Sequence, residues 1–316
     1  MATPTQSPFA PGSVSLRLYP HELEAPDLVR VLLEQAALAS AVGFDGVMTA
    51  EHHGGFRGYL PNPTQVAGWC LDVMDRGWAA PCPILLPLRH WTHVAEELAW
   101  LANRFPGRLG AGFGAGGWQG DFDLVEIPFA ENLTRFKDAL PRVVPALRGG
   151  AEPPLSADAA IASLTAAPLP LMLATGSPGG MRLAASLSLG VIFDSLQTLE
   201  RIRALNDAYT EAGGTGPRVL IRRAWIGDPP DTEIQSQMQF YRSYTSSASQ
   251  SHWGSGKELV QADDGAVLAE RLAATLAQSG CDALNLRVHL HGVPPGPVSE
   301  QIERIGTEAI PLLHAR

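Results

Sequence analysis

The sequence predicts one α/β domain, a single (β/α)8 TIM barrel, and three observations support this prediction. Eight short apolar segments alternate along the chain with segments of helical periodicity. The apolar segments lack the alternation of half-exposed strands, which is typical of parallel strands covered by helices on both faces. No glycine fingerprint of a dinucleotide-binding fold follows the first strand, so eight units within 316 residues favour a closed barrel over an open sheet.

The expected strands and helices follow one another in order. We expect strands at about 14–19, 46–50, 82–86, 109–114, 170–174, 190–193, 218–226 and 283–289. Helices are expected at 25–43, 62–74, 90–105, 129–150, 178–190, 198–214 and 299–316. The first helix has apolar residues at helical spacing and ends at Gly43, and the second begins at Asn62 with Pro63 in its first position.

Two segments fall outside this alternation. Residues 1–12 are rich in Pro, Ser and Thr, so we expect a flexible tail there and the barrel domain at 13–316. Residues 239–259 combine Ser, Gly and aromatic side chains beyond the seventh strand. That position lies at the mouth of a barrel, so this stretch is either a lid or an ordinary surface loop.

Composition excludes several classes of function. The net charge is −9 and no basic run occurs, which gives no reason to expect nucleic acid or an anionic membrane as a partner. No apolar run reaches the roughly 20 residues of a membrane span, and the N-terminus does not resemble a signal peptide. The cysteines at 70, 82 and 281 form no zinc pattern, and the simplest interpretation is a reduced, cytoplasmic protein.

The motif Glu51-His52-His53 follows the second strand, at the expected mouth of the barrel. Adjacent side chains on an extended segment point to opposite sides and cannot easily share a metal ion, so we expect no metal site here. One histidine whose pKa lies near neutrality suits general acid/base chemistry. Glu51 either orients that histidine or is a buried structural carboxylate.

Two segments rich in small residues are candidates for ligand contacts. Ala174, Thr175, Gly176 and Ser177 end the fifth strand just before a helix, where backbone N–H groups and hydroxyls suit a phosphate. The alternative is a plain turn with a serine cap. The glycine-rich stretch 110–117 lacks the Lys-Ser/Thr of a P-loop, so its glycines either let a flat ring approach the backbone or only form a turn.

Several longer motifs together resemble one known family. They read "GFDGVMTAEHH", "LPNPTQVAG", "ILLPLRHWTHVAEELAWLANRFPGRLGAGFGAGG", "LMLATGSPGGMRLAASLSLG" and "RIGTEAIPLL". In this order, over nearly the whole chain, they resemble the bacterial luciferase-like flavin-dependent monooxygenases. The fold of that family is a (β/α)8 barrel, in agreement with the strand count.

The resemblance implies where a flavin would lie. It implies a phosphate site at Ala174–Ser177, an acid/base function for His52, and a cis peptide beneath the ring near Cys82–Pro83. Candidate substrate contacts are Trp118 and Asp121, with Tyr59 and Trp253 as further aromatic residues of the pocket.

The sequence also departs from the luciferases at two positions. Ala115 stands where the luciferases have an arginine that helps to hold the phosphate, and Arg182, Arg222 or Arg223 could replace it. Gly114 stands at the position of their reactive cysteine, so light emission is not expected.

The function implied is a monooxygenase that uses reduced FMN from a separate flavin reductase, and O2, to oxygenate a small apolar or aromatic substrate. One alternative is hydride transfer with a deazaflavin coenzyme, whose acidic tail would need basic residues around the mouth. The sequence shows no strong basic cluster there. The other alternative is a non-catalytic partner subunit. The resemblance further implies a homodimer.

Overall fold

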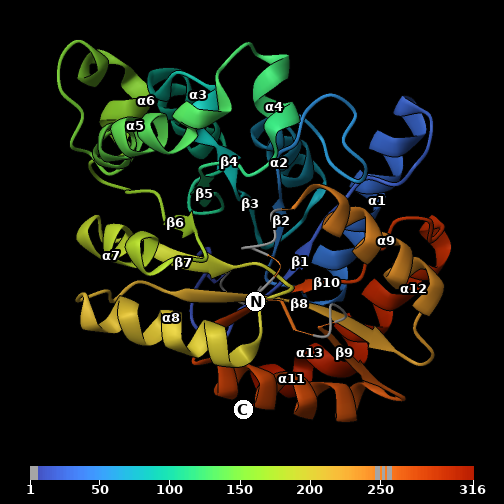
Figure 1. The fold of residues 1–316 in the computed structure, drawn as a ribbon. Helices are drawn as coiled ribbons and strands as arrows, with labels where there is room; N and C mark the ends of the chain where they lie inside the picture. The colour runs from blue at the N-terminus through green and yellow to red at the C-terminus, as the bar shows by residue number, and fades with distance from the viewer. Residues whose placement is uncertain (1–5, 246–249, 251–252, 255–257) are drawn as a thin grey trace.

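The structure is a computed structural model that describes residues 6–245, 250, 253–254 and 258–316 (Figure 1). Parallel strands form a nearly closed barrel in the order β3-β2-β1-β10-β8-β7-β6-β5-β4, and β9 pairs with the end of β8. The strands are β1 Val14–Arg17, β2 Gly46–Thr49, β3 Trp78–Pro81, β4 Ile84–Leu85, β5 Ala111–Gly114, β6 Leu171–Ala174, β7 Gly190–Phe193, β8 Arg218–Ile226, β9 Leu259–Ala262 and β10 Ala283–Arg287. The predicted barrel is therefore confirmed.

Helices surround the strands on the outside of the barrel (Figure 1). They are α1 Ala25–Val42, α2 Pro63–Val73, α3 Trp91–Arg104, α4 Gln119–Leu124, α5 Asn132–Ala146, α6 Ala159–Ser163, α7 Pro178–Ser186, α8 Leu199–Glu211, α9 Asp231–Tyr244, α11 Gly265–Ser279, α12 Pro295–Arg304 and α13 Ile310–His314. Short 3₁₀ helices are η1 Leu86–Leu88, η2 Phe129–Glu131 and η3 Leu155–Ala157, and η4 Ile305–Ala309 is a π-helix. Within the described ranges, none is both long and apolar enough to cross a membrane.

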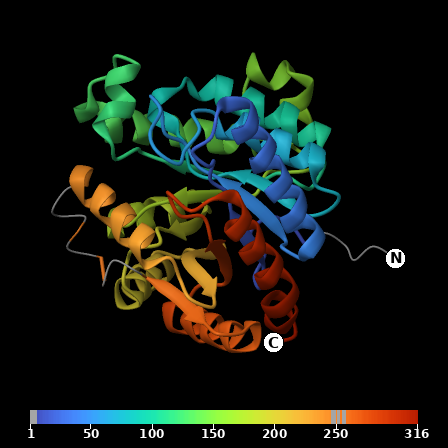
Figure 2. The same cartoon turned by 90° about the vertical axis from the view of Figure 1, so that its right-hand side faces the viewer.

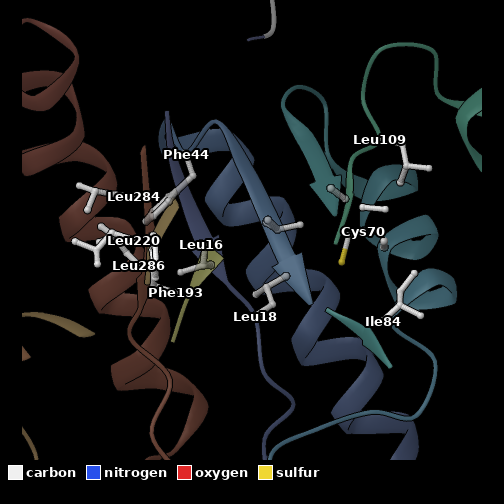
Figure 3. Close-up of a cluster of buried hydrophobic side chains, with 14 of the residues drawn as sticks. Leu16, Leu18, Phe44, Cys70, Ile84, Leu109, Phe193, Leu220, Leu284 and Leu286 are labelled. Atoms are coloured by element: carbon white, nitrogen blue, oxygen red, sulfur yellow. The ribbon is translucent and has the colours of Figure 1, made fainter. Parts of the chain in front are cut away.

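Alternate residues of each strand face the helices or the barrel interior, as the pleat requires. Leu16, Leu284 and Leu286 belong to the outer apolar layer between strands and helices (Figure 3). A second apolar cluster, which includes Met48, Trp78 and Ala283, lies inside the barrel. Two separate layers follow, and the interior one supports the site.

The N-terminal segment is more ordered than the predicted tail of residues 1–12. Phe9 is fully buried, and its ring meets Trp78 edge-on with 5.2 Å between the centroids. Gly110 has no side chain because an added Cβ would lie 2.5 Å from the Phe9 ring. The barrel core thus begins before residue 13.

The third strand differs from its prediction at 82–86. It runs as β3 and β4 on either side of Cys82–Pro83, and this bond is cis, as predicted. β3 pairs with β2, whereas β4 pairs with β5. The interruption thus lies where the two ends of the sheet meet.

The stretch between β8 and β10 holds elements that were not predicted. The helix α9 covers residues 231–244, so the predicted lid or loop at 239–259 begins inside a helix. The rest of that prediction falls largely on 246–249, 251–252 and 255–257, outside the described residues. The helix α11 has clear local signals, since Asp264 accepts a hydrogen bond from Val267 N and Gly280 ends the helix in a left-handed conformation.

Candidate active site

The carboxyl ends of the strands form one face of the barrel, with α4 and α9 beside it. Figure 2 shows α4 in green and α9 in orange on the same side of the molecule, opposite the side where the described chain begins. The segments that follow β2, β5 and β6 all begin at this mouth, because the strands are parallel. The predicted site residues therefore come from one end of the barrel.

His52 is paired with a buried carboxylate. Its Nδ1 lies 2.7 Å from Oδ2 of Asp121, which stands in α4 and is fully buried. The other Asp121 oxygen accepts the backbone N–H of His53, also at 2.7 Å. Asp121, expected as a substrate contact, instead fixes both the ring and the backbone of the histidine segment. A carboxylate at Nδ1 leaves Nε2 as the proton-transfer atom of His52.

Glu51 has a different environment and makes only contacts within the protein. One of its oxygens accepts the backbone N–H of Leu85 at 2.8 Å, and the other lies 2.8 Å from Nε2 of His53 and 3.1 Å from Nη2 of Arg89. Glu51 is itself almost fully buried. These contacts tie the end of β2 to β4 and α3, so the structure favours the structural alternative for Glu51 over the catalytic one.

Aromatic rings line the mouth around His52. Phe56 stacks on the His52 ring with 4.2 Å between centroids, and Tyr59 meets it edge-on at 4.5 Å. Trp118 lies 6.1 Å away and contacts Phe56. Two rings of α9, Phe240 and Tyr244, pack on the far side of Phe56.

Trp253 was also predicted to line the pocket, and the structure places it with the α9 rings Phe240 and Tyr244 rather than against His52. It forms a bridge with Gln197 and packs on the cluster of Leu196, Met238 and Tyr241. Its ring makes no stacking contact with His52 or its aromatic neighbours among the described residues. Tyr59, Trp118 and Asp121 are therefore brought to His52, and Trp253 is not.

The turn after β6 has the features expected of an anion site. Ser177 caps α7 by accepting the N–H of Gly180, and Thr175 Oγ1 accepts that of Ser177. Arg201, in the first turn of α8, donates to the carbonyl of Gly176 at 3.2 Å. Its Nε is buried without a hydrogen-bond partner among the described residues. Arg201 was missed in the sequence because α8 follows the next strand, although an arginine in that first turn is a usable signal.

Two of the arginines proposed from the sequence to hold a phosphate are engaged elsewhere. Arg222 donates to the carbonyls of Gln197 and Ser195, and Arg223 donates to the side chain of Gln237. Arg182 is exposed on α7, with its Nη2 4.0 Å from an added Cβ at Gly179 in the first turn of that helix. Arg201 therefore donates to the turn itself, and Arg182 lies beside it.

The residues predicted beneath a flavin ring are largely packed. Cys82 is fully buried, burial raises its pKa to about 12, and its Sγ would lie 2.1 Å from a Cβ at Gly112. Its thiol is therefore enclosed, and any ligand contact would come from the backbone. Pro83 is half-buried opposite Gly114, and Ala115 is half-buried. Packing alone thus explains Gly112.

Two arginines inside the barrel were not singled out from the sequence. Arg17 ends β1 and Arg287 ends β10, and both are nearly fully buried. Tyr19 lies between them: its hydroxyl accepts from Nε of Arg17 at 3.1 Å, and the Arg287 guanidinium stands 4.3 Å from its ring centroid. Burial alone would raise the pKa of Tyr19, but Arg287 and Arg17 outweigh burial and lower it to about 8. A charged residue at an inward position of an apolar strand was the available signal.

Two buried histidines lie beside this cluster. The rings of His21 and His289 are 4.6 Å apart, and together they border a cavity of about 250 Å³. Burial lowers the pKa of both, and for His289 the nearby His21 and Arg287 lower it further. In the described part of the chain, no three His, Cys, Asp or Glu side chains are arranged to hold a metal ion.

The residues present fit an FMN phosphate at the turn after β6. The exposed turn offers the hydroxyls of Thr175 and Ser177, and the unsatisfied Nε of Arg201 is a buried donor beside it. The Arg201 guanidinium also adds a positive charge at this turn, which favours an anion there.

A family model and a relative of known sequence match this chain. The family model described as luciferase-like monooxygenase matches residues 9–305. Protein y4vJ of Sinorhizobium fredii, which is uncharacterised, is 25% identical over 220 residues, spanning 64% of this chain and 62% of the length of y4vJ.

Three solved structures share the fold. Monooxygenase RslO1 from Streptomyces bottropensis has a TM-score of 0.76 at 18% identity, covering 95% of this chain and 99% of its own. The oxygenating constituent of 3,6-diketocamphane monooxygenase from Pseudomonas putida, in complex with FMN, has a TM-score of 0.74 at 17% identity, covering 95% and 98%. An F420-dependent secondary alcohol dehydrogenase has a TM-score of 0.68 at 14% identity, covering 93% and 97%.

Proposed function

The chain belongs to the luciferase-like monooxygenase family, and from this premise we propose that it uses reduced FMN and O2 to oxygenate a small organic substrate. The retained Glu51-His52-His53 motif favours an enzyme over a non-catalytic partner subunit of the same family. One observation supports a phosphate-bearing cofactor: Arg201 donates to the carbonyl of Gly176 beside the hydroxyls of Thr175 and Ser177. FMN is favoured over the deazaflavin coenzyme because the sequence has no strong basic cluster for the acidic tail of that coenzyme. Thr175, Ser177 and Arg201 would hold the phosphate, and reduced FMN would supply the oxygen-activating chemistry.

His52 is the proton-transfer residue of this proposal. Asp121 accepts from Nδ1 and so fixes the tautomer in which Nε2 lacks a proton, which lets Nε2 take a proton from a reacting group and return it. Asp121 is thus a positioning residue, and its second contact, to the backbone of His53, holds the segment in register.

The aromatic rings around His52 would keep water from the reacting atoms. Phe56, Tyr59 and Trp118 surround the imidazole, and α9 closes over Phe56. Apolar walls strengthen the electrostatic interactions inside and suit an aromatic or apolar body in the substrate.

Assembly and location complete the proposal. A separate flavin reductase would supply reduced FMN, and the three free cysteines fit a reducing cytoplasm. A homodimer is supported by the large apolar side chains left exposed on α3 and α5, of which Trp100 is 56% and Leu133 56% exposed. Light scattering of the wild type beside Trp100→Glu tests it, and a dimer that persists in the variant would exclude this face.

Hydride transfer with a deazaflavin coenzyme is the second candidate, because a dehydrogenase that uses F420 shares the fold over 97% of its length. Anaerobic titrations with reduced FMN and with reduced F420, followed by fluorescence, distinguish the two. Tight binding of FMN, and labelled O2 appearing in a product, would support the monooxygenase. Preferential binding of F420 with no oxygen incorporation would replace it with the hydride-transfer enzyme.

A further inference from the structure

Arg17 and Arg287 are buried positive charges in the barrel interior with neutral partners, and Arg223, beside Arg287 on the paired strand β8, is a further buried guanidinium there. Arg17 donates to the carbonyl of Cys82, to the Tyr19 hydroxyl and to Asn285 Oδ1. Arg287 donates to the His289 carbonyl at 3.2 Å and to the Tyr241 hydroxyl at 2.7 Å. Among the described residues, no carboxylate forms an ion pair with either. Elsewhere at the mouth an arginine does have a counter-charge: Arg89 pairs with Glu51.

The guanidinium groups of Arg17 and Arg287 each keep one nitrogen without a partner among the described residues. Arginine has five N–H donors. Nη2 of Arg17 and Nη1 of Arg287 make no hydrogen bond to any described residue. Neither atom belongs to the fully enclosed polar atoms that lack a partner, such as Nε1 of Trp78. Both nitrogens therefore remain within reach of a small molecule in the mouth.

The electrostatic cost of this arrangement indicates an anion. Arg17 is 5% and Arg287 is 4% exposed. Charges so deeply buried are costly unless they are paired, and the tyrosine hydroxyls around them neutralise nothing while they stay protonated. A negatively charged group that reaches the free Nη atoms would balance the charge and complete their hydrogen bonds.

The position of this pair separates it from the phosphate turn. Arg17 and Arg287 end the neighbouring strands β1 and β10, whereas Ala174–Ser177 follows β6. In the barrel order, β8 and β7 separate β10 from β6 on one side. An anion at Arg17 and Arg287 is thus not the phosphate of a cofactor held at the turn by Arg201.

We propose that Arg17 and Arg287 form a subsite for the acidic group of the substrate, which is a planar organic anion bearing a carboxylate, phenolate or enolate oxygen. The rings of Tyr19, Tyr59 and Tyr241 give its body flat apolar walls. This inference rests on the proposed function only in assigning the anion to the substrate. It refines the expected apolar or aromatic substrate by adding one negative charge.

Tyr19 provides an internal reporter of the subsite. Its hydroxyl lies between the two arginines, with Tyr59 and His289 as its ring neighbours. The two positive charges favour the Tyr19 phenolate, and a bound anion would offset them. Occupation of the subsite therefore raises the pKa of Tyr19 above about 8.

The test compares acids with neutral isosteres on the flavin-free protein. The probes are benzoate and 2-naphthoate against benzamide and 2-naphthamide, measured by isothermal titration calorimetry. Wild type and the surface control Arg30→Gln should bind each acid about tenfold or more tightly than its amide, as charge-assisted hydrogen bonds predict. Arg17→Gln and Arg287→Gln should bring that ratio close to one, and Arg287→Lys should keep part of it. Equal binding of acid and amide by wild type, or no binding of either acid, overturns the proposal.

A second measurement needs no arginine variant to fold. The pH titration of tyrosinate absorbance in wild type, assigned with Tyr19→Phe, should shift upward when 2-naphthoate is added and stay unchanged with 2-naphthamide. No shift with the acid contradicts the subsite. FMN binding is measured in parallel. A protein that prefers acids but does not bind FMN contradicts only the proposed function, and one that binds FMN but does not prefer acids contradicts only the subsite.

Discussion

The two sides of the barrel mouth differ in whether a nitrogen-containing side chain has a carboxylate partner. After β2, His52 is partly exposed and its Nδ1 faces the carboxylate of Asp121. At the ends of β1 and β10, Arg17 and Arg287 are more deeply buried and face only neutral oxygens. A titratable group with a built-in counter-charge is suited to moving a proton, whereas a permanent cation without one is suited to holding an anion. The two sides therefore divide chemistry from recognition.

Removing the proton-handling side should have the largest effect. His52→Gln should slow the oxidation of substrate by about 10²–10⁴-fold, the usual contribution of a general acid/base. The melting temperature should change little, because the His52 side chain is partly exposed. Stopped-flow kinetics with reduced FMN measures the rate. Unchanged rates in His52→Gln would show that the comparison assigns proton transfer to the wrong side.

Glu51 separates structure from chemistry on the His52 side. Glu51→Gln should lower the free energy of unfolding by about 3 kcal/mol, since it removes the buried carboxylate that contacts Arg89 and His53 and leaves Arg89 only the partly exposed Glu97. Denaturation in urea measures this loss. The fraction that remains folded should keep a near-normal turnover rate. A stable variant with lost turnover would restore the catalytic interpretation of Glu51.

Arg201 tests whether the phosphate turn is independent of the interior arginines. Arg201→Ala should weaken FMN binding about 10–100-fold, as loss of a charged hydrogen bond predicts. Arg203→Ala, two residues along the same helix and bonded to Ala277 O, is the matched control and should bind FMN normally. Flavin fluorescence measures both. Equal losses in the two variants would mean that FMN binding depends on the overall positive charge of the helix and not on the contact of Arg201 with the turn.

The smallest expected effect concerns His21 and His289, which lie behind the arginine side. Their folded pKa values are lowered from the usual 6.5, so below that pH the unfolded chain binds protons that the folded chain does not. Stability should therefore fall as pH decreases through 6.5, by at most about 1.4 kcal/mol per pH unit for each histidine. Urea denaturation at several pH values, with His289→Gln as the less pH-dependent variant, measures it. An equally steep slope in the variant would contradict this origin.

Local patterns predicted much of the fold but not which charged side chains of the site pair with one another. The caps at Asn62 and Ser177 and the barrel itself follow from short-range signals, whereas the cis bond at Cys82–Pro83 was expected from the family resemblance. The third strand was predicted as one segment at 82–86 because "CPILLPL" is apolar throughout. Apolarity alone does not show where a strand changes its pairing partner.

The candidate site was predicted by residue but not by contact. His52, Asp121, Tyr59 and Trp118 do lie together, yet the sequence offered no reason to pair His52 with a residue 69 positions away. Trp253 was grouped with them by its chemistry alone, and it packs with the α9 rings Phe240 and Tyr244 rather than against His52.

The sequence by itself determined the alternation of strands and helices, the turn after β6 and the histidine motif, because these depend on periodicity and on neighbours within one turn. Only the tertiary structure decided which charges meet. Closing the barrel sets β1 beside β10 and brings Arg17 to Asn285, 268 positions apart, with Arg287 on the same strand. Burial then sets the strength of each charge interaction, and burial is a property of the closed barrel rather than of any segment.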